Sequence, residues 1–246
     1  MEKIIFRVII ITSACCLSAK HAHIQQKLNW GEARSYCRSY HTDLTSLSSE
    51  QEEDLFRKFV DPNDEGWIGV YWDQTTSTWK WSGGDDVTFW KDLYLYYTQY
   101  ELNKPYDPNR NVYWRRDRWL ARYGYIPHSF FCLSLTVVQE EKTWEEALEH
   151  CRKINENLTS LLSETENLLA TNEIQQSSIT EPVWIGLRYL GDTWLWVNGD
   201  PLEYDAWSQG GDQDRQCPMK RRCGALTKEG QFSLGHCDKT TDNHQS

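Results

Sequence analysis

Beyond its first twenty residues, the sequence lacks an apolar run long enough to cross a membrane. It also lacks a basic excess, because the formal net charge is −10 at pH 7, which argues against a nucleic-acid binder. The G-x-S-x-G and H-E-x-x-H patterns of common hydrolases are both missing. We therefore expect a chain that is not an enzyme and that has no membrane span in its mature form.

The apolar segment at the N-terminus is typical of a secretory signal peptide. Lys3 and Arg7 are followed by a mostly apolar stretch, and Leu17 and Ala19 stand before a possible cleavage point. An N-terminal membrane anchor is the alternative, but the stretch is too short for one. We predict a signal peptide over residues 1–19 and a secreted, extracellular protein.

Paired C-x-x-C or H-x-x-x-H spacings, which would predict a zinc site, are missing as well. Removal of the leader takes away Cys15 and Cys16 and leaves six cysteines, an even number that favours disulfides in a secreted chain. The sequon Asn-Leu-Thr at 157–159 agrees with secretion. We predict that Asn157 is exposed at a polar turn and glycosylated.

One stretch of the sequence occurs twice at an offset of 114 residues. Residues 29–47 and 143–161 are identical at nine of nineteen positions without a gap, including the motif Trp-x-x-Ala-x-x-x-Cys. An offset of this size fits a compact domain better than a solenoid repeat. We therefore predict two domains, over residues 20–133 and 134–246.

Each copy predicts two helices followed by strands. Asn29 and Thr143 are the predicted caps of the first helix, each with a glutamate three residues later that completes a capping box. Ser49 and Ser163 are the predicted caps of the second helix. A Trp-Ile-Gly run, a polar turn and a Trp-x-Trp run follow in each copy, a pattern that indicates a β-hairpin with its tryptophans in the core.

The order of these motifs resembles the C-type lectin domain, and its duplication resembles the tandem lectin proteins of the macrophage mannose receptor type. The resemblance covers nearly the whole mature chain. It implies an α+β fold with two C-type lectin-like domains. Each would have two helices, a mixed or antiparallel β-sheet and a long loop region that carries the ligand site. Duplication of a recognition module can raise its avidity for multivalent ligands.

The resemblance also implies how the cysteines pair. In the family, the cysteine of the first helix is joined to one in the last strand, and Cys37 and Cys132 fit that role. A second disulfide staples the long loop, and Cys223 and Cys237 resemble that pair. The first domain has no cysteine between its two, so its long loop lacks the staple.

The second domain departs from the family at its C-terminal end. The final aromatic-x-Cys is absent, so the last strand looks truncated or divergent. Cys151 therefore lacks its family partner, and Cys217 is an extra cysteine. The two either pair with each other or remain thiols, and both alternatives stay open.

Calcium-dependent sugar binding in the family relies on a loop Glu-Pro-Asn or Gln-Pro-Asp and a strand Trp-Asn-Asp, whose oxygens hold the ion. The second domain has Gly-Asp-Gln at 211–213 and Phe-Ser-Leu at 232–234 instead. Asp212 and Asp214 are weak ligand candidates, since solvated loop charge explains them equally simply. In the first domain, Asp-Pro-Asn at 107–109 is only a superficial echo. We expect no metal and no cofactor, because the motifs do not support calcium.

An arginine-rich stretch over residues 110–123 stands out in this acidic protein. Arginine binds sulfate, phosphate or carboxylate groups through two parallel hydrogen bonds, and aromatic rings stack on sugar faces. The alternative is a divergent loop whose arginines pair with acidic residues of the same chain. The candidate ligand-binding residues are Arg115, Arg116, Arg118, Trp114 and Trp119.

Two functions follow from these observations. The first is a secreted recognition protein of the C-type lectin class that binds glycans or glycoproteins without the usual calcium site. The second is a protein-binding module of the same fold that has lost sugar binding. The sequence specifies neither the ligand nor the oligomeric state.

Overall fold

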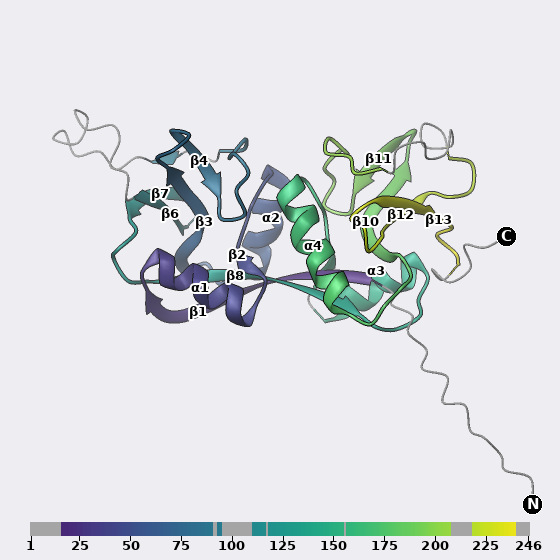
Figure 1. Ribbon diagram of the computed structural model, residues 1–246, viewed down its shortest axis with the longest axis horizontal. Coiled ribbons are helices and arrows are strands. Elements are labelled where there is room, and N and C mark those ends of the chain that lie inside the picture. The colour runs from purple at the N-terminus through teal and green to yellow at the C-terminus, as the bar shows by residue number, and fades with distance from the viewer. Residues whose placement is uncertain are drawn as a thin grey trace, which may run out of the picture.

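The computed structural model describes residues 16–90, 93–94, 110–116, 118–154, 156–207 and 218–239. Two lobes lie side by side, and β1 (Cys16–Leu28) and β8 (His128–Val138) run through both as a long antiparallel pair (Figure 1). We call the lobe formed by the residues between β1 and β8 in the sequence the first unit. The lobe formed by the residues after β8 is the second unit. Each has two helices and several strands, so the predicted α+β fold is confirmed.

The remaining elements each belong to one unit. In the first unit they are α1 (Trp30–Tyr40), β2 (Asp43–Leu44), α2 (Glu50–Phe59), β3 (Glu65–Asp73), β4 (Thr78–Trp81), β5 (Leu93–Tyr94), β6 (Arg110–Arg115) and β7 (Arg118–Tyr123). In the second unit they are α3 (Trp144–Lys153), β9 (Asn157–Leu158), α4 (Glu164–Gln176), β10 (Val183–Leu190), β11 (Thr193–Trp196), β12 (Cys223–Leu226) and β13 (Phe232–Gly235). Within the described ranges, no helix has the length and apolar character that a membrane crossing requires.

One hydrogen-bonded sheet passes through both units in the order β13-β12-β10-β1-β8-β3-β6-β7-β5. In addition, β4 pairs with β3 and β11 pairs with β10, which forms the predicted Trp-x-Trp hairpin in each unit. The predicted boundaries after residues 19 and 133 fall inside β1 and β8. These two strands contribute to both units, so a boundary drawn on the sequence repeat cuts through them.

The first helix of each unit starts where the cap pattern predicts. The Asn29 side chain accepts a hydrogen bond from the Glu32 N–H at 2.8 Å, and the Asn29 N–H donates to the Glu32 carboxylate at 3.1 Å. Thr143 forms the same capping box in the second unit. Ser49 and Ser163 cap α2 and α4 with their hydroxyl oxygens. These local bonds satisfy N–H groups that a helix start otherwise leaves without partners.

Equivalent tryptophans fix each first helix against the sheet. The indole N–H of Trp30 donates to the Ile68 carbonyl at 2.9 Å, and that of Trp144 donates to the Ile185 carbonyl at 2.8 Å. The tryptophans of the two hairpins pack in the core clusters, as predicted; the four are Trp79, Trp81, Trp194 and Trp196.

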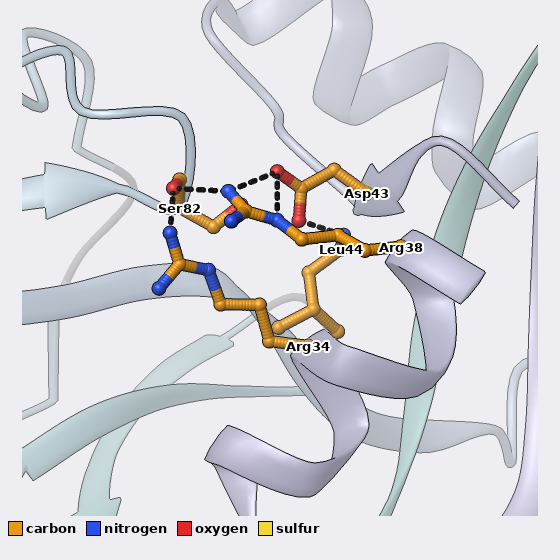
Figure 2. Close-up of polar contacts among 5 residues, drawn as sticks. All are labelled: Arg34, Arg38, Asp43, Leu44 and Ser82. Atoms are coloured by element: carbon orange, nitrogen blue, oxygen red, sulfur yellow. Dashed lines mark hydrogen bonds and ion pairs between the residues drawn. The ribbon is translucent and has the colours of Figure 1, made fainter.

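A buried carboxylate holds the turn after α1 in the first unit. The Asp43 side chain is 2% exposed and accepts from Arg38 Nε and Nη2 at 3.2 and 3.0 Å (Figure 2). Arg38 and Arg34 also donate to the Ser82 carbonyl at 2.9 and 2.6 Å, which ties α1 to the end of β4. Asn157 stands at the position equivalent to Asp43, so the second unit does not repeat this ion pair.

The two units face each other through α2 and α4 (Figure 1), and their contacts are reciprocal. Asp85 of the first unit accepts from the Thr165 N–H at 3.0 Å, at the start of α4. Asp200 of the second unit accepts from the Ser49 hydroxyl, at the start of α2. Each carboxylate thus lies at a helix N-terminus, where the helix dipole favours negative charge.

Glu166 of α4 is buried at this interface. Its carboxylate accepts from the Ser48 hydroxyl of the first unit at 2.8 Å and from the Leu162 N–H at 2.7 Å. Burial, together with the nearby Asp85 carboxylate, raises the pKa of Glu166 above its usual value. Burial and the negative charge of Glu166 likewise raise the pKa of Glu52 of α2. Two carboxyls from the two units therefore share a region that disfavours their charged forms.

Replacing Glu166 with glutamine should flatten the dependence of stability on pH. A carboxyl whose pKa is raised by folding stabilises the folded state below its ordinary pKa of 4.5, and this contribution is lost as the pH rises through the raised value. Glutamine has the same shape and does not titrate. Urea denaturation at several pH values measures the free energy of unfolding. Above pH 4.5, this free energy should therefore fall less for Glu166→Gln than for the parent protein.

The matched control is Glu164→Gln, because Glu164 is an exposed residue of the same helix. Its pH profile should overlay that of the parent protein. Identical pH profiles for the parent and Glu166→Gln would show that titration of Glu166 does not contribute to the pH dependence of stability.

Candidate functional site

The arginine-rich stretch forms the antiparallel hairpin β6–β7, whose side chains alternate between two faces. Trp114 and Trp119 lie opposite each other and face the core of the first unit, with exposed fractions of 2% and 0%. Their indole N–H groups donate to the two oxygens of buried Glu53 at 2.8 and 3.1 Å. Both tryptophans drop out of the predicted ligand-stacking residues, because neither ring has a face open to a ligand.

Arg115, Arg116 and Arg118 lie at the exposed tip of the hairpin. Arg115 Nε pairs with a Glu65 oxygen at 2.7 Å, the internal pairing that the alternative interpretation expects. Arg116 has a φ of 45°, because the turn between the two strands requires the left-handed conformation there. Arg116 and Arg118 are exposed to solvent, which leaves them accessible to a ligand.

Part of the same hairpin lines a surface hollow with a volume of ≈ 410 Å³. We call this feature the arginine hollow. Its lining residues are Arg110, Arg115, Leu120, Ala121, Arg122, Tyr123 and Ile126. Three arginines therefore contribute to the lining, Arg110 from one face of the hairpin and Arg115 and Arg122 from the other, together with apolar and aromatic residues.

Aromatic rings hold two of these arginines in place. The guanidinium of Arg110 lies 5.0 Å from the ring centre of Tyr123, and that of Arg122 lies 4.8 Å from the ring centre of Tyr113. Cation–π contacts orient a guanidinium without neutralising its charge. Burial and the charge of Arg122 lower the pKa of neighbouring His128. Within the described ranges, Arg122 makes no ion pair with a carboxylate, so its charge is available to an anion.

The arrangement can bind an acidic group beside a sugar ring. A planar guanidinium forms two parallel hydrogen bonds to sulfate or carboxylate. The rings of Tyr123 and Tyr125 stack with centres 5.5 Å apart, and Tyr125 is 68% exposed. Aromatic surface of this kind packs against the apolar face of a sugar.

The sequence-based choice of residues overlaps the lining of the hollow only at Arg115. It favoured the tip and omitted Arg110 and Arg122, which line the hollow. Alternation along each strand places Arg115, Arg118 and Arg122 on the face opposite to Trp114 and Trp119, whereas Arg110 shares the face of the two tryptophans. That count requires the bounds of the two strands, which the sequence left undefined.

The strand that carries calcium ligands in sugar-binding relatives can be located in both units. Trp119 of β7 packs edge-on against Trp81, and Phe232 of β13 packs edge-on against Trp196 in the second unit. The two positions after each aromatic hold Leu and Ala at 120–121, and Ser and Leu at 233–234. These four side chains contain no carboxylate or amide oxygen, which is what calcium would need there.

The acidic loop candidates cannot be placed. Asp212, Asp214 and the Asp-Pro-Asn at 107–109 all lie outside the described residues. Among the residues that the structure does describe, no group of three or more His, Cys, Asp or Glu side chains could hold a metal ion. Calcium independence therefore stays a prediction.

Comparison with protein families identifies the two units. The Lectin C-type domain family matches residues 26–133 and again residues 140–242. This chain belongs to the C-type lectin domain family. The predicted duplication of the lectin domain is confirmed by the two matches.

Two curated relatives of this chain are much longer proteins. The secretory phospholipase A2 receptor of Bos taurus is 25% identical over 256 residues, which cover 89% of this chain and 17% of the receptor. Lymphocyte antigen 75 of Homo sapiens is 22% identical over 252 residues, which cover 87% of this chain and 14% of that protein. The chain thus spans less than a fifth of the length of these relatives.

Two solved structures that match each cover less than half of the chain. A complex of SPL-1 with GlcNAc shares 17% identity and a TM-score of 0.38, over 47% of this chain and 87% of that one. The carbohydrate-recognition domain of the mouse scavenger receptor C-type lectin shares 24% identity and a TM-score of 0.36, over 42% and 79% of the two chains.

Both predicted disulfides of the lectin domains are confirmed. Cys37 of α1 is joined to Cys132 of β8 across 95 residues of sequence. Cys223 and Cys237 are joined across 14 residues. Cys217, the extra cysteine, lies outside the described residues.

The sequence had suggested that the sequon asparagine is exposed at a turn, and the structure corrects this expectation. Asn157 lies in β9, is half-buried, and has an enclosed Oδ1 without a hydrogen-bond partner in the described part of the chain. The reason is that β1 covers this position by pairing Ala19 with Asn157. Glycosylation of Asn157 stays a prediction, and a mass shift after enzymatic removal of N-glycans would test it.

Proposed function

We propose that this protein is a secreted recognition protein of the C-type lectin class that binds acidic carbohydrate or glycoprotein ligands through the arginine hollow. The observation that supports the proposal is that Arg110, Arg115 and Arg122 all line one surface hollow. Of these, Arg122 meets no carboxylate among the described residues. A sulfate or carboxylate group on a sugar supplies the counter-ion that this site lacks.

Secretion is supported by the cysteine chemistry. Two disulfides persist in oxidising compartments and are rare in the reducing cytosol. The predicted leader and the sequon at Asn157 agree with the same route. The extracellular location is therefore part of the proposal.

The proposal includes binding without calcium. A calcium ion needs about six to eight oxygen ligands, and the strand positions at 120–121 and 233–234 offer one serine hydroxyl in total. Isothermal titration with calcium should show no saturable site tighter than about 100 µM, within the range that calcium sites span. Ligand binding that disappears on addition of a chelator would restore the calcium-dependent mechanism.

Replacing Arg122 with serine should weaken binding to sulfated glycans by about tenfold or more. Hydrogen bonds to charged groups contribute roughly 1.5–3 kcal/mol, and serine cannot form the two-pronged contact. Binding should also weaken as salt rises, because exposed charges are screened over about 8–10 Å at physiological ionic strength. A glycan array that holds sulfated and neutral forms of the same sugars, with and without chelator, measures these effects.

The matched control is Arg152→Ser, which removes the same charge from an exposed position of α3 in the second unit. It should leave binding unchanged. A double replacement of Arg116 and Arg118 by serine leaves every residue that lines the hollow in place and tests the hairpin tip separately. Equal binding of sulfated and neutral sugars, or equal losses in the Arg122 and Arg152 variants, would rule out the arginine hollow as the site.

A protein ligand is the second candidate. The relative from Bos taurus is named as a receptor for a protein, secretory phospholipase A2. Exposed Tyr125 and Ile126, the latter also lining the hollow, are suited to a protein interface. No binding on the glycan array together with a positive pull-down from extracellular fluid would favour this candidate.

A further inference from the structure

Two buried thiols from distant parts of the chain meet in the second unit. The sulfur atoms of Cys16 on β1 and Cys151 on α3 lie 3.4 Å apart, and both side chains are fully buried. They share an apolar cluster with Trp144 and Trp184. A disulfide bond of roughly 2.05 Å would require the two sulfurs to approach by about 1.4 Å.

The first residues of β1 occupy the place in the second unit that the central residues of β8 occupy in the first. Both segments pair with the short strand after the first helix and run parallel to the Trp-Ile-Gly strand. Leu133–Asp43 in the first unit corresponds to Ala19–Asn157 in the second, and Cys132–Leu44 corresponds to Ser18–Leu158. On the other side, Phe130–Trp67 corresponds to Cys16–Trp184. The backbone repeats as well, since Thr45 N donates to Phe131 O at 2.9 Å and Thr159 N to Leu17 O at 3.1 Å.

This equivalence explains which sulfur reaches the helix of the second unit. Cys151 of α3 is the counterpart of Cys37, which is joined to Cys132 of β8. The strand beside Cys151 is β1, so the cysteine within reach is Cys16. The strand position that matches Cys132 holds Ser18, and Cys16 lies two residues before it.

We propose that Cys16 and Cys151 form a disulfide that fastens the N-terminal strand to the second unit. Each thiol loses a proton, and the two sulfurs together lose two electrons as the S–S bond forms. The electrons reduce the disulfide of an oxidised thiol carrier of the secretory pathway, such as oxidised glutathione, to two thiols. The bond closes a loop of 135 residues, longer than the 95 and 14 residues that the disulfides Cys37–Cys132 and Cys223–Cys237 span.

The proposal has a consequence for processing of the N-terminus. Cleavage after Ala19, the predicted end of the leader, would remove Cys16 together with Leu17, which is fully buried in the core of the second unit. The disulfide therefore requires that the leader be cut before Cys16. The two alternatives differ in the first residue of the secreted chain, which can be sequenced directly.

The first test is a disulfide map of the full chain secreted from eukaryotic cells. Free thiols are blocked with an alkylating reagent, and the protein is digested with trypsin without reduction. We expect the peptide over residues 143–152, which contains Cys151, to be linked to the N-terminal peptide that ends at Lys20, with fragmentation assigning the bond to Cys16. Alkylated Cys151, a Cys151–Cys217 link, a bond to Cys15, or a mature chain that begins at Lys20 would each overturn the proposal.

The second test is thermal unfolding of Cys16→Ser, Cys151→Ser and the double variant. Because the bond joins the N-terminus to a helix distant in sequence, each single variant should unfold about 5–15 °C below the parent protein. The double variant should unfold at the same temperature as the singles. Cys15→Ser is the matched control and should unfold like the parent.

If the variants are not secreted, the disulfide map of the parent protein decides alone. Equal unfolding temperatures for the parent and Cys16→Ser would overturn the proposal.

Discussion

Replacing Glu53 with alanine is expected to lower the free energy of unfolding of the first unit by about 3–5 kcal/mol, the usual cost of removing one partner of a buried ion pair. The Glu53 side chain is fully buried and accepts from the indole N–H groups of Trp114 and Trp119. It also pairs with Arg57 Nε at 3.2 Å. Alanine would leave two buried indole donors without their acceptor and would remove the carboxylate that pairs with Arg57 Nε.

Urea denaturation followed by tryptophan fluorescence measures this loss. The matched control is Asp54→Ala, one residue further along α2, because Asp54 is 55% exposed and lies 3.8 Å from the same Arg57. Surface substitutions of this kind usually change stability by less than about 0.5 kcal/mol. A loss below about 1 kcal/mol for Glu53→Ala would mean that water or another group replaces the carboxylate as acceptor.

Replacing Cys37 and Cys132 together with alanine should cost about 4 kcal/mol of stability. A disulfide restricts the unfolded chain, and the restriction grows with the loop that it closes. This one spans 95 residues and joins α1 to a strand shared by both units. The Cys223–Cys237 pair spans 14 residues, so its removal should cost about 3 kcal/mol on the same account.

The two double variants are compared by denaturation under the same conditions, with the remaining disulfide verified by mass spectrometry. The expected order is a larger loss for the Cys37/Cys132 variant. A larger loss for the Cys223/Cys237 variant would contradict the loop-length account and indicate that local packing decides the difference.

Glu53 also marks a position at which the sequence repeat does not predict the contacts of the second unit. Its equivalent in the second unit, one offset of 114 later, is Asn167. The Asn167 amide donates to the Gly230 carbonyl at 2.8 Å, so the two residues stabilise their units through different partners. The buried network of Glu53 depends on Trp114 and Trp119, which the second unit does not contain at equivalent positions.

The candidate site shows the same limit. The sequence predicted a cluster of arginines and aromatics over residues 110–123, and the structure contains it as β6–β7. It could not predict that Trp114 and Trp119 face Glu53 while Arg115 and Arg122, on the opposite face of the hairpin, line a hollow. Inward and outward positions alternate along a strand, so an error of one residue in register exchanges them.

The sequence by itself determined the features that depend on neighbouring residues or on repetition. These are the capped helices, the Trp-x-Trp hairpins, the duplicated lectin domain and, through the family resemblance, the two disulfides. Only the tertiary structure decided that β1 and β8 pass through both units, and that Cys16 of a predicted leader lies beside Cys151. The physical reason is that strand pairing joins residues far apart in the chain, and no local pattern encodes the partner or the register.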